Sequence, residues 1–280
     1  MGRWLRFAAL VIVSLFVVSV GREIKINYED ELPVYNHTLA KIIVEYASAV
    51  YITDLTELFT WTCSRCDDFT KEFEVIELIV DIQNCLQAFV GVDPDLNSIV
   101  IAFRGTQEHS LRNWIEDLFW KQLDLKYPGM PDAMVHHGFY SAYHNTTLRQ
   151  GILNAIQRAI DIYGNISIFV TGHSMGGALA SFCALDLAVW LQDTEIEGTT
   201  RTIEKLCDDS GEDPYCSRSV SGNSIADHLN YYGIALKADS WGSCRIVMGT
   251  RAEVQYNVDY NGNIRLSRDP TLSLSKQIYL

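Results

Sequence analysis

A five-residue turn constrains the fold of this chain more than any other feature. Gly172-His173-Ser174-Met175-Gly176 stands between an apolar, β-branched run at 166–171 and a run of small and apolar residues at 176–191. The first run is typical of a buried strand and the second of a buried helix. When a strand turns directly into a helix, backbone atoms crowd together, and glycines beside the serine leave room for them. The sequence therefore predicts a strand, a strained turn with Ser174 at its apex, and a helix.

Further helical and strand patterns lie upstream of this unit. Residues 38–50 and 146–163 have helical periodicity. Residues 88–92 and 98–103 are apolar, β-rich runs, and the turn-forming residues 93–97 separate them. Strands that alternate with helices are typical of an α/β fold in which helices flank a mostly parallel sheet.

The composition excludes several classes of protein. The chain has 280 residues, 48% of them hydrophobic, with 6 prolines and a net charge of −13, which suits one sizeable globular domain. Such an acidic chain lacks the basic footprint of a nucleic-acid-binding protein and a polybasic membrane-docking patch. We therefore expect no nucleic-acid partner, and the sequence does not define the oligomeric state.

The first 21 residues have the pattern of a secretory signal peptide. Arg3 and Arg6 precede an apolar run over 7–20, and Ser19 and Gly21 are small residues suited to cleavage. An uncleaved membrane anchor is the alternative, but the run is shorter than the ~20 residues that a spanning helix needs. We expect cleavage, no membrane span afterwards, and an extracellular or vacuolar (lumenal) location.

Secretion also determines how the seven cysteines are interpreted. A Cys-x-x-Cys pair in the cytosol can be half a zinc site or a redox motif, but no second Cys or His pair lies at metal spacing. In an oxidising lumen, disulfides are favoured. The candidate pairs are Cys63 with Cys66, Cys207 with Cys216, and Cys85 with Cys244. Cys183, inside an apolar helical run, is the unpaired cysteine. Sequons at Asn36, Asn145 and Asn165 also suit a secreted glycoprotein.

The serine at the turn needs a base if it is to react. A serine hydroxyl is a poor nucleophile until a neighbouring histidine, usually steered by a carboxylate, accepts its proton. His173 points away from Ser174 in such a turn. Four of the other upstream histidines lie in or near sequons or are adjacent on a strand: His37, His144, His136 and His137. His228 is the histidine that follows Ser174, which is the order typical of α/β-hydrolases.

Five motifs follow one another along the chain: IVIAFRGT at 99–106, RNWIEDL at 112–118, VHHGF at 135–139, GHSMGGALA at 172–180 and DHLNYYG at 227–233. Together they resemble the class 3 lipases, which comprise the fungal triacylglycerol lipases and their plant relatives. The resemblance runs from about residue 38 to residue 248. It implies an α/β-hydrolase fold and a serine-dependent carboxylic-ester hydrolase. The implied substrate is an acylglycerol or related lipid ester at a lipid–water interface, with no cofactor and no metal.

The resemblance also implies the roles of individual residues. Ser174 would be the nucleophile and His228 the general base, while Thr106 and the backbone N–H of Met175 would form the oxyanion hole. Residues 111–120 resemble the family's lid. The residues of its apolar stripe are Leu111, Trp114, Ile115, Leu118 and Phe119, at helical spacing. A core-facing helix is the alternative interpretation of that stripe.

The resemblance is interrupted after the nucleophile helix. In the family, a strand and a loop carrying the triad aspartate come before the histidine, and nothing here resembles them. Beyond residue 191, about fifty residues contain no run long enough for a buried strand, and only 245–248 suggests one. We infer an internal deletion near 189/190, as from a skipped exon, with loss of one or more central strands.

No other carboxylate fits the missing position. Asp186 lies on the nucleophile helix, Asp227 cannot easily reach the ring of the adjacent His228, and the acidic residues of the 207–216 loop suit a solvated turn. We expect a signal peptide at 1–21, an interrupted α/β-hydrolase domain at 22–248 and a tail at 249–280. The function is then a lipase of impaired activity or, as the alternative, a non-catalytic lipid-binding or aberrant splice product.

Overall fold

The computed structural model describes residues 36–106, 122–125, 133–192, 225–238, 246–249, 256–259 and 261–268. All of them belong to one compact unit of the chain, Asn36–Thr200 with Asn223–Leu280. The expected signal peptide and the expected lid lie outside the described residues. So do three of the candidate disulfide cysteines: Cys207, Cys216 and Cys244.

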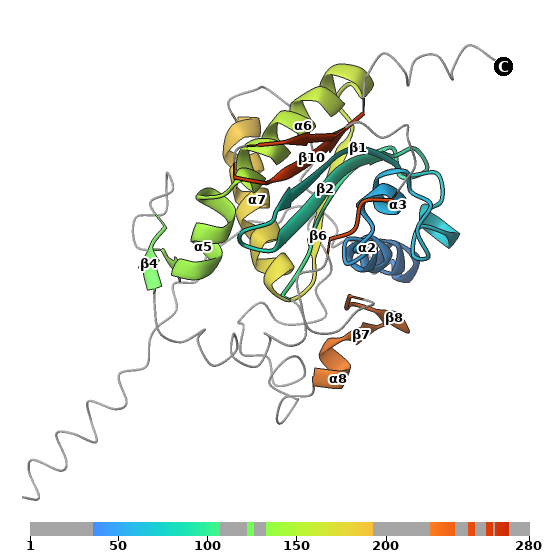
Figure 1. Ribbon diagram of the computed structural model, residues 1–280, viewed down its shortest axis with the longest axis horizontal. Helices are drawn as coiled ribbons and strands as arrows, with labels where there is room; N and C mark the ends of the chain where they lie inside the picture. The colour runs from blue at the N-terminus through green and yellow to red at the C-terminus, as the bar shows by residue number, and fades with distance from the viewer. Residues whose placement is uncertain are drawn as a thin grey trace, which may run out of the picture. The chain divides into compact units, whose positions relative to one another are not determined.

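A six-stranded sheet forms the centre of this unit (Figure 1). Its strand order is β6 (Ser167–Gly172), β3 (Ser98–Phe103), β2 (Leu86–Asp93), β1 (Glu74–Asp81), β10 (Ile264–Ser267) and β9 (Tyr256–Val258). Strands β3 and β6 pair in parallel, and the other four described pairings are antiparallel. The sheet is therefore mixed, whereas the sequence predicted a mostly parallel one. The connections at 82–85 and 94–97 are too short for a parallel crossover.

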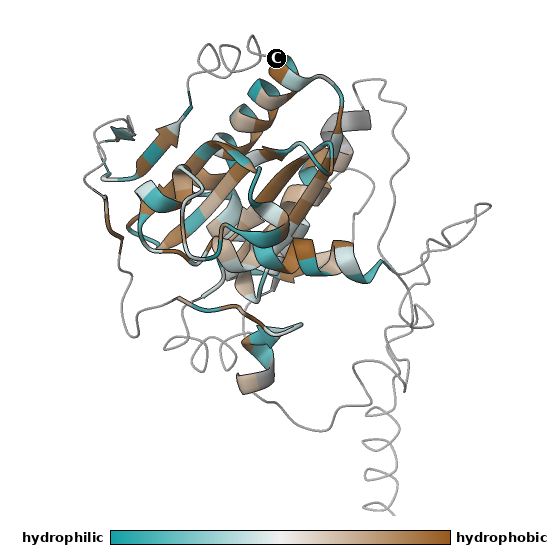
Figure 2. Ribbon diagram, turned by 90° about the vertical axis from the view of Figure 1, so that its right-hand side faces the viewer, coloured by the Kyte–Doolittle hydropathy of each residue, from teal (hydrophilic) through white to brown (hydrophobic). Residues whose placement is uncertain are grey.

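Helices cover both faces of the sheet (Figure 1). The helices α5 (His137–His144), α6 (Thr147–Tyr163) and α7 (Met175–Gln192) pack on one face, and α2 (His37–Ala49) and α3 (Leu55–Phe59) on the other. Because side chains alternate along a strand, β3 contributes to two cores. Ile99 and Ile101 face α6 and α7, while Val100 faces α2. Hydrophobic residues accordingly predominate along the central strands (Figure 2).

Most of the expected elements are present. The segments predicted as helices or strands at 38–50, 88–92, 98–103, 146–163, 166–171 and 176–191 correspond to α2, β2, β3, α6, β6 and α7. Val247 forms an isolated parallel bridge with Asp54 rather than a strand. Strand β10 pairs with β1, so the folded unit extends past residue 248, where the sequence predicts a tail. No described helix is long and apolar enough to cross a membrane.

Strand β1 was not predicted, and a buried charge explains why. Glu77 interrupts its apolar pattern and is fully buried. Its carboxylate forms ion pairs with Arg158 of α6 and with Arg265 of β10, the latter at 3.5 Å. Buried charges of this kind need partners. These partners are remote in sequence and come together through the tertiary fold.

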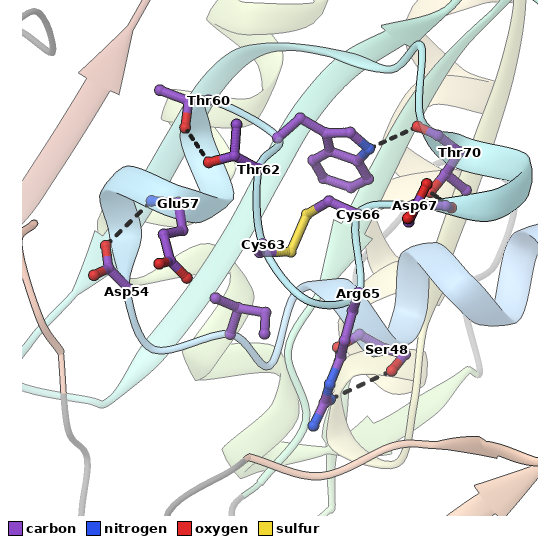
Figure 3. The surroundings of a disulfide bond; sticks show 12 residues. Ser48, Asp54, Glu57, Thr60, Thr62, Cys63, Arg65, Cys66, Asp67 and Thr70 are labelled. Atoms are coloured by element: carbon purple, nitrogen blue, oxygen red, sulfur yellow. Dashed lines mark hydrogen bonds between the residues drawn. A yellow bond between two sulfur atoms is a disulfide. The ribbon is translucent and has the colours of Figure 1, made fainter. Parts of the chain in front are cut away.

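A disulfide closes the turn that follows α3 (Figure 3). Cys63 and Cys66 are bonded, as predicted, with their Cα atoms 5.0 Å apart. Arg65 lies inside this turn and donates to the backbone oxygen of Ser48 at 3.1 Å. Cys85 is also disulfide-bonded, and Cys183 is free and buried, in agreement with the prediction for that residue.

Strand β6, which leads into the serine turn, lies at one edge of the described sheet. Its neighbour β3 is buried along its whole length, whereas Ser167 is exposed and Ile168, Phe169 and Val170 are half-buried. Among the described residues, no strand pairs with the other side of β6.

Candidate active site

The serine turn has the strained geometry that the sequence predicts. Ser174 has a φ of 58°, a conformation that costs energy for any residue with a side chain. A Cβ on Gly172 would lie 2.3 Å from the carbonyl carbon of Gly176, and one on Gly176 would lie 2.2 Å from the backbone oxygen of Phe103. Both glycines are therefore required by backbone packing. Ser174 stands at the N-terminus of α7, where amide groups and the helix dipole favour negative charge.

His173 is held by hydrogen bonds on both ring nitrogens. Its Nε2 lies 2.6 Å from the backbone oxygen of His228. Because a carbonyl can only accept, Nε2 carries the proton, and Nδ1 accepts from the hydroxyl of Tyr51 at 2.9 Å. Burial, reinforced by the neighbouring His228, lowers the pKa of His173 to about 4. His173 is thus neutral and fully engaged, and neither nitrogen is available to serve Ser174.

His228 ends the short helix α8 (Ile225–His228) and packs against His173, with ring centroids 4.4 Å apart. Burial lowers the pKa of His228 below its ordinary value, which keeps the imidazole neutral, as a general base requires. Its Nε2 is buried and has no hydrogen-bond partner among the described residues. Within the described part of the chain, no carboxylate bonds to this ring.

The segment that carries His228 continues into a hairpin of β7 (Asn230–Tyr231) and β8 (Ile234–Ala235). Leu229 and Leu236, which flank the hairpin, are buried. The hydroxyl of Ser48 on α2 donates to the backbone oxygen of Ala235 at 2.6 Å, and Arg65 donates to the same oxygen at 3.4 Å. The hairpin is therefore anchored to α2 and to the disulfide turn.

The two expected oxyanion donors lie together. Thr106 follows β3, and its hydroxyl lies 3.5 Å from the sulfur of Met175, the residue after Ser174. The backbones of Gly105 and His173 lie very close together, because a Cβ on Gly105 would lie 2.3 Å from the backbone oxygen of His173. The end of β3 and the serine turn are thus in van der Waals contact, which suits a shared anion-binding position.

Asp186 has a structural role, so it cannot serve as the acid of the site. It is buried on α7 and accepts from the hydroxyl of Tyr143 at 3.0 Å. The guanidinium of Arg149 bonds both carboxylate oxygens, at 2.7 and 3.1 Å. Residues 207–216 and the side chain of Asp227 lie outside what the structure describes. The described residues contain no group of three or more His, Cys, Asp or Glu arranged to hold a metal ion.

Sequence reasoning missed Tyr51. The residue is 122 positions from His173 and belongs to no motif with a characteristic spacing. The phenol reaches His173 because the chain that follows α2 crosses the end of β3. That contact depends on the tertiary fold, so no local pattern indicates it.

A strand, a serine with positive φ and a helix, set in a mixed sheet with helices on both faces, define an α/β-hydrolase. Residues 100–202 match the family model described as lipase (class 3). The matched segment contains Thr106, Ser174 and Met175. This segment, 103 of the chain's 280 residues, is therefore similar to the class 3 lipases.

Individual relatives agree with this assignment. A lipase of Rhizomucor miehei is 34% identical over 128 residues, which are 46% of this chain and 33% of that protein. A lipase of Caenorhabditis elegans is 29% identical over 183 residues, 64% of this chain and 48% of the relative. The structure of a fungal lipase–inhibitor complex has the same fold, with a TM-score of 0.53 and 23% identity over 74% of this chain and 99% of that one. The chain thus spans between a quarter and a half of the length of the curated relatives that it matches.

Proposed function

We propose that the protein hydrolyses carboxylic esters through Ser174. The observation that carries the proposal is the serine at the apex of the turn, with a φ of 58° and the N-terminus of α7 behind it. The Ser174 oxygen attacks the ester carbonyl while His228 takes its proton, and His228 returns the proton to the leaving alcohol. The backbone N–H of Met175 and the Thr106 residue stabilise the oxyanion. Water then hydrolyses the acyl-serine by the same route.

The substrate class follows from the relatives. Their names include lipase, secreted mono- and diacylglycerol lipase, and phospholipase A1. These substrates share a fatty acyl ester of glycerol. We therefore propose an acylglycerol or a related lipid ester, met at a lipid–water interface, and no metal or organic cofactor.

The His228 ring sets the expected level of activity. Without a carboxylate to orient the imidazole, serine hydrolases lose about 10⁴ in kcat. Two observations also support a second candidate, a non-catalytic lipid-binding or splice product of a lipase. The Nε2 of His228 lacks a hydrogen-bond partner in the part of the chain that the structure describes, and strand β6 is half-exposed. The two candidates differ in whether Ser174 reacts.

A short-chain ester assay separates them. Purified protein is compared with Ser174→Ala and with Ser181→Ala, a matched change at an exposed serine of the same helix. The enzyme proposal requires a rate that Ser174→Ala abolishes and Ser181→Ala keeps. Labelling with a fluorophosphonate measures the same nucleophile without turnover. Equal rates and equal labelling for all three proteins would leave the non-catalytic candidate.

We further propose entry into the secretory pathway, with signal cleavage after Gly21. The Cys63–Cys66 disulfide fits an oxidising compartment, and the sequon residues Asn36, Asn145 and Asn165 are all exposed. N-terminal sequencing of the expressed protein should begin at Arg22, and glycosidase treatment should lower its mass. An intact Met1 with no change in mass would contradict this route.

A further inference from the structure

We propose that His173 and Tyr51 are positioning residues that hold His228 in place through its backbone. The inference rests on the proposed function, in which His228 is the general base. Three observations support it. His173 hydrogen bonds to the backbone of His228, Tyr51 hydrogen bonds to His173, and a set of buried polar side chains holds Tyr51 in place.

The contact between His173 and His228 acts at the base itself. The Nε2–H of His173 donates to the carbonyl oxygen of His228 at 2.6 Å, so it fixes the peptide plane next to the Cα atom that bears the imidazole. His173 is itself held rigidly, because it lies between strand β6 and Ser174 in the tight serine turn. The nucleophile and the backbone of the base are thereby joined through one residue.

Tyr51 determines which nitrogen of His173 carries the proton. The phenol donates to Nδ1 at 2.9 Å, and the backbone of Gly105 hydrogen bonds to the phenol oxygen. With Nδ1 accepting, the proton of the neutral ring is on Nε2, where the His228 carbonyl needs a donor. Removal of the phenol hydroxyl would let the ring adopt the other tautomer and lose that donor.

A buried polar set holds Tyr51. The amide of Gln87 donates to the backbone oxygens of Val50 and Ile52, on either side of Tyr51, at 2.9 and 3.0 Å. The guanidinium of Arg104 donates to the oxygen of the same Gln87 amide at 3.0 Å. Both side chains are buried, so these hydrogen bonds are stronger than they would be in water. The phenol thus has little freedom to leave His173.

This arrangement matters more here because the described residues place no carboxylate on the His228 ring. In a serine hydrolase, an acid normally fixes the imidazole from the ring side. In this chain, the backbone contact from His173 joins the serine turn to the base directly. Orientation of the base therefore depends on the contacts of Tyr51 and His173.

The test uses substitutions at both residues and a matched control. His173→Phe removes the donor, His173→Gln keeps an N–H near the Nε2 position, and Tyr51→Phe removes the phenol hydroxyl. Tyr143→Phe removes another buried phenol hydroxyl, which bonds Asp186 on the opposite face of the sheet. For the ester assay we expect kcat to fall about tenfold in His173→Phe and about fivefold in Tyr51→Phe, with KM within about twofold. His173→Gln and Tyr143→Phe should stay within about threefold of the parent.

A second measurement does not depend on activity. Amide hydrogen exchange over 228–236, recorded in the Ser174→Ala background, should be faster with His173→Phe and Tyr51→Phe than with His173→Gln or Tyr143→Phe. Unchanged kcat and unchanged exchange in the first two variants would overturn the positioning role and leave the proposed function intact. If the parent has no Ser174-dependent activity, the proposed function fails, and the exchange rates alone decide whether the two residues hold the segment.

Discussion

Gly176 and Gly164 differ in how close an added Cβ would lie to neighbouring atoms. In Gly176→Ala the Cβ would lie 2.2 Å from the backbone oxygen of Phe103, so the turn or β3 must move. We expect a loss of about 3 kcal/mol or more in the free energy of unfolding, and loss of ester hydrolysis. Gly164→Ala is the control, since its Cβ has nothing within 4 Å and only its φ of 77° is unfavourable, at about 1–2 kcal/mol. Urea unfolding measures both, and equal losses would contradict the packing explanation.

The fall in kcat/KM at acidic pH should report the protonation of the His228 imidazole. The imidazole accepts a proton from Ser174 only when neutral, so the rate falls as pH drops through its pKa. Burial lowers that pKa below the ordinary 6.5, and a carboxylate partner would raise it. We therefore expect kcat/KM to be flat near neutrality and to reach half its maximum below pH 6.5. A midpoint above pH 6.5 would indicate a carboxylate beside His228 and would contradict the loss of the triad acid.

At the scale of the site, sequence reasoning and structure agree where chemistry leaves a local pattern. Ser174 and its glycines could be predicted because a strained turn restricts residue types at fixed spacing. Thr106 and Met175 followed from motifs that resemble a family. Tyr51 could not be predicted, because its partner lies 122 residues away and phenols are common in cores.

The disulfide turn is the element whose removal tests the anchoring of the hairpin. A disulfide that closes a loop of about four residues contributes about 2 kcal/mol in the chain-entropy model. Arg65 lies inside this loop and donates to Ser48 (Figure 3). It also donates to the backbone oxygen of Ala235 in β8. We expect the double substitution Cys63→Ala and Cys66→Ala to lower the melting temperature and to speed amide exchange in β7 and β8.

Arg65→Met, with the disulfide intact, separates the two effects. It should speed exchange in the hairpin with a smaller change in melting temperature, because it removes the contacts to Ser48 and Ala235 but keeps the loop closed. Hairpin exchange that is the same in both variants and in the parent would show that Leu229, Leu236 and Ser48 suffice to hold the segment.

Among the elements, those with a single periodicity were predictable and those with a long-range partner were not. Helices α2 and α6 have one apolar face, and β3 and β6 have uniform apolar runs, so their patterns are complete within the segment. Strand β1 contains Glu77, whose partners Arg158 and Arg265 come from α6 and β10. Strand β10 has four residues and is defined by its pairing with β1. The mixed direction of the sheet follows from these pairings, which no local pattern contains.

At the scale of the whole molecule, we propose one explanation for two observations: the half-exposed edge at β6, and the lack of a carboxylate on the His228 ring among the described residues. A strand following α7 would pair with the open side of β6, and the loop after it would carry the triad acid, as the resemblance to class 3 lipases implies. The proposed deletion near 189/190 would remove both together. A transcript of the same locus that encodes extra residues between Val189 and Trp190 would support it, and a genomic sequence without room for them would count against it.

Restoring the segment tests this explanation on the protein. A chimaera carries, between Val189 and Trp190, the strand and acid loop that precede the histidine in class 3 lipases. Covering β6 should raise the free energy of unfolding, since a paired central strand buries apolar surface at about 25 cal/mol per Å². Restoring the acid should raise kcat by about 10⁴. The matched control is the same chimaera with its triad Asp changed to Asn. That control should keep the gain in stability but lose most of the gain in rate, because the added strand alone cannot orient His228. A chimaera and control with equal rates would show that His228 is not held by that acid, and that the base of this chain works through its backbone contacts or does not work at all.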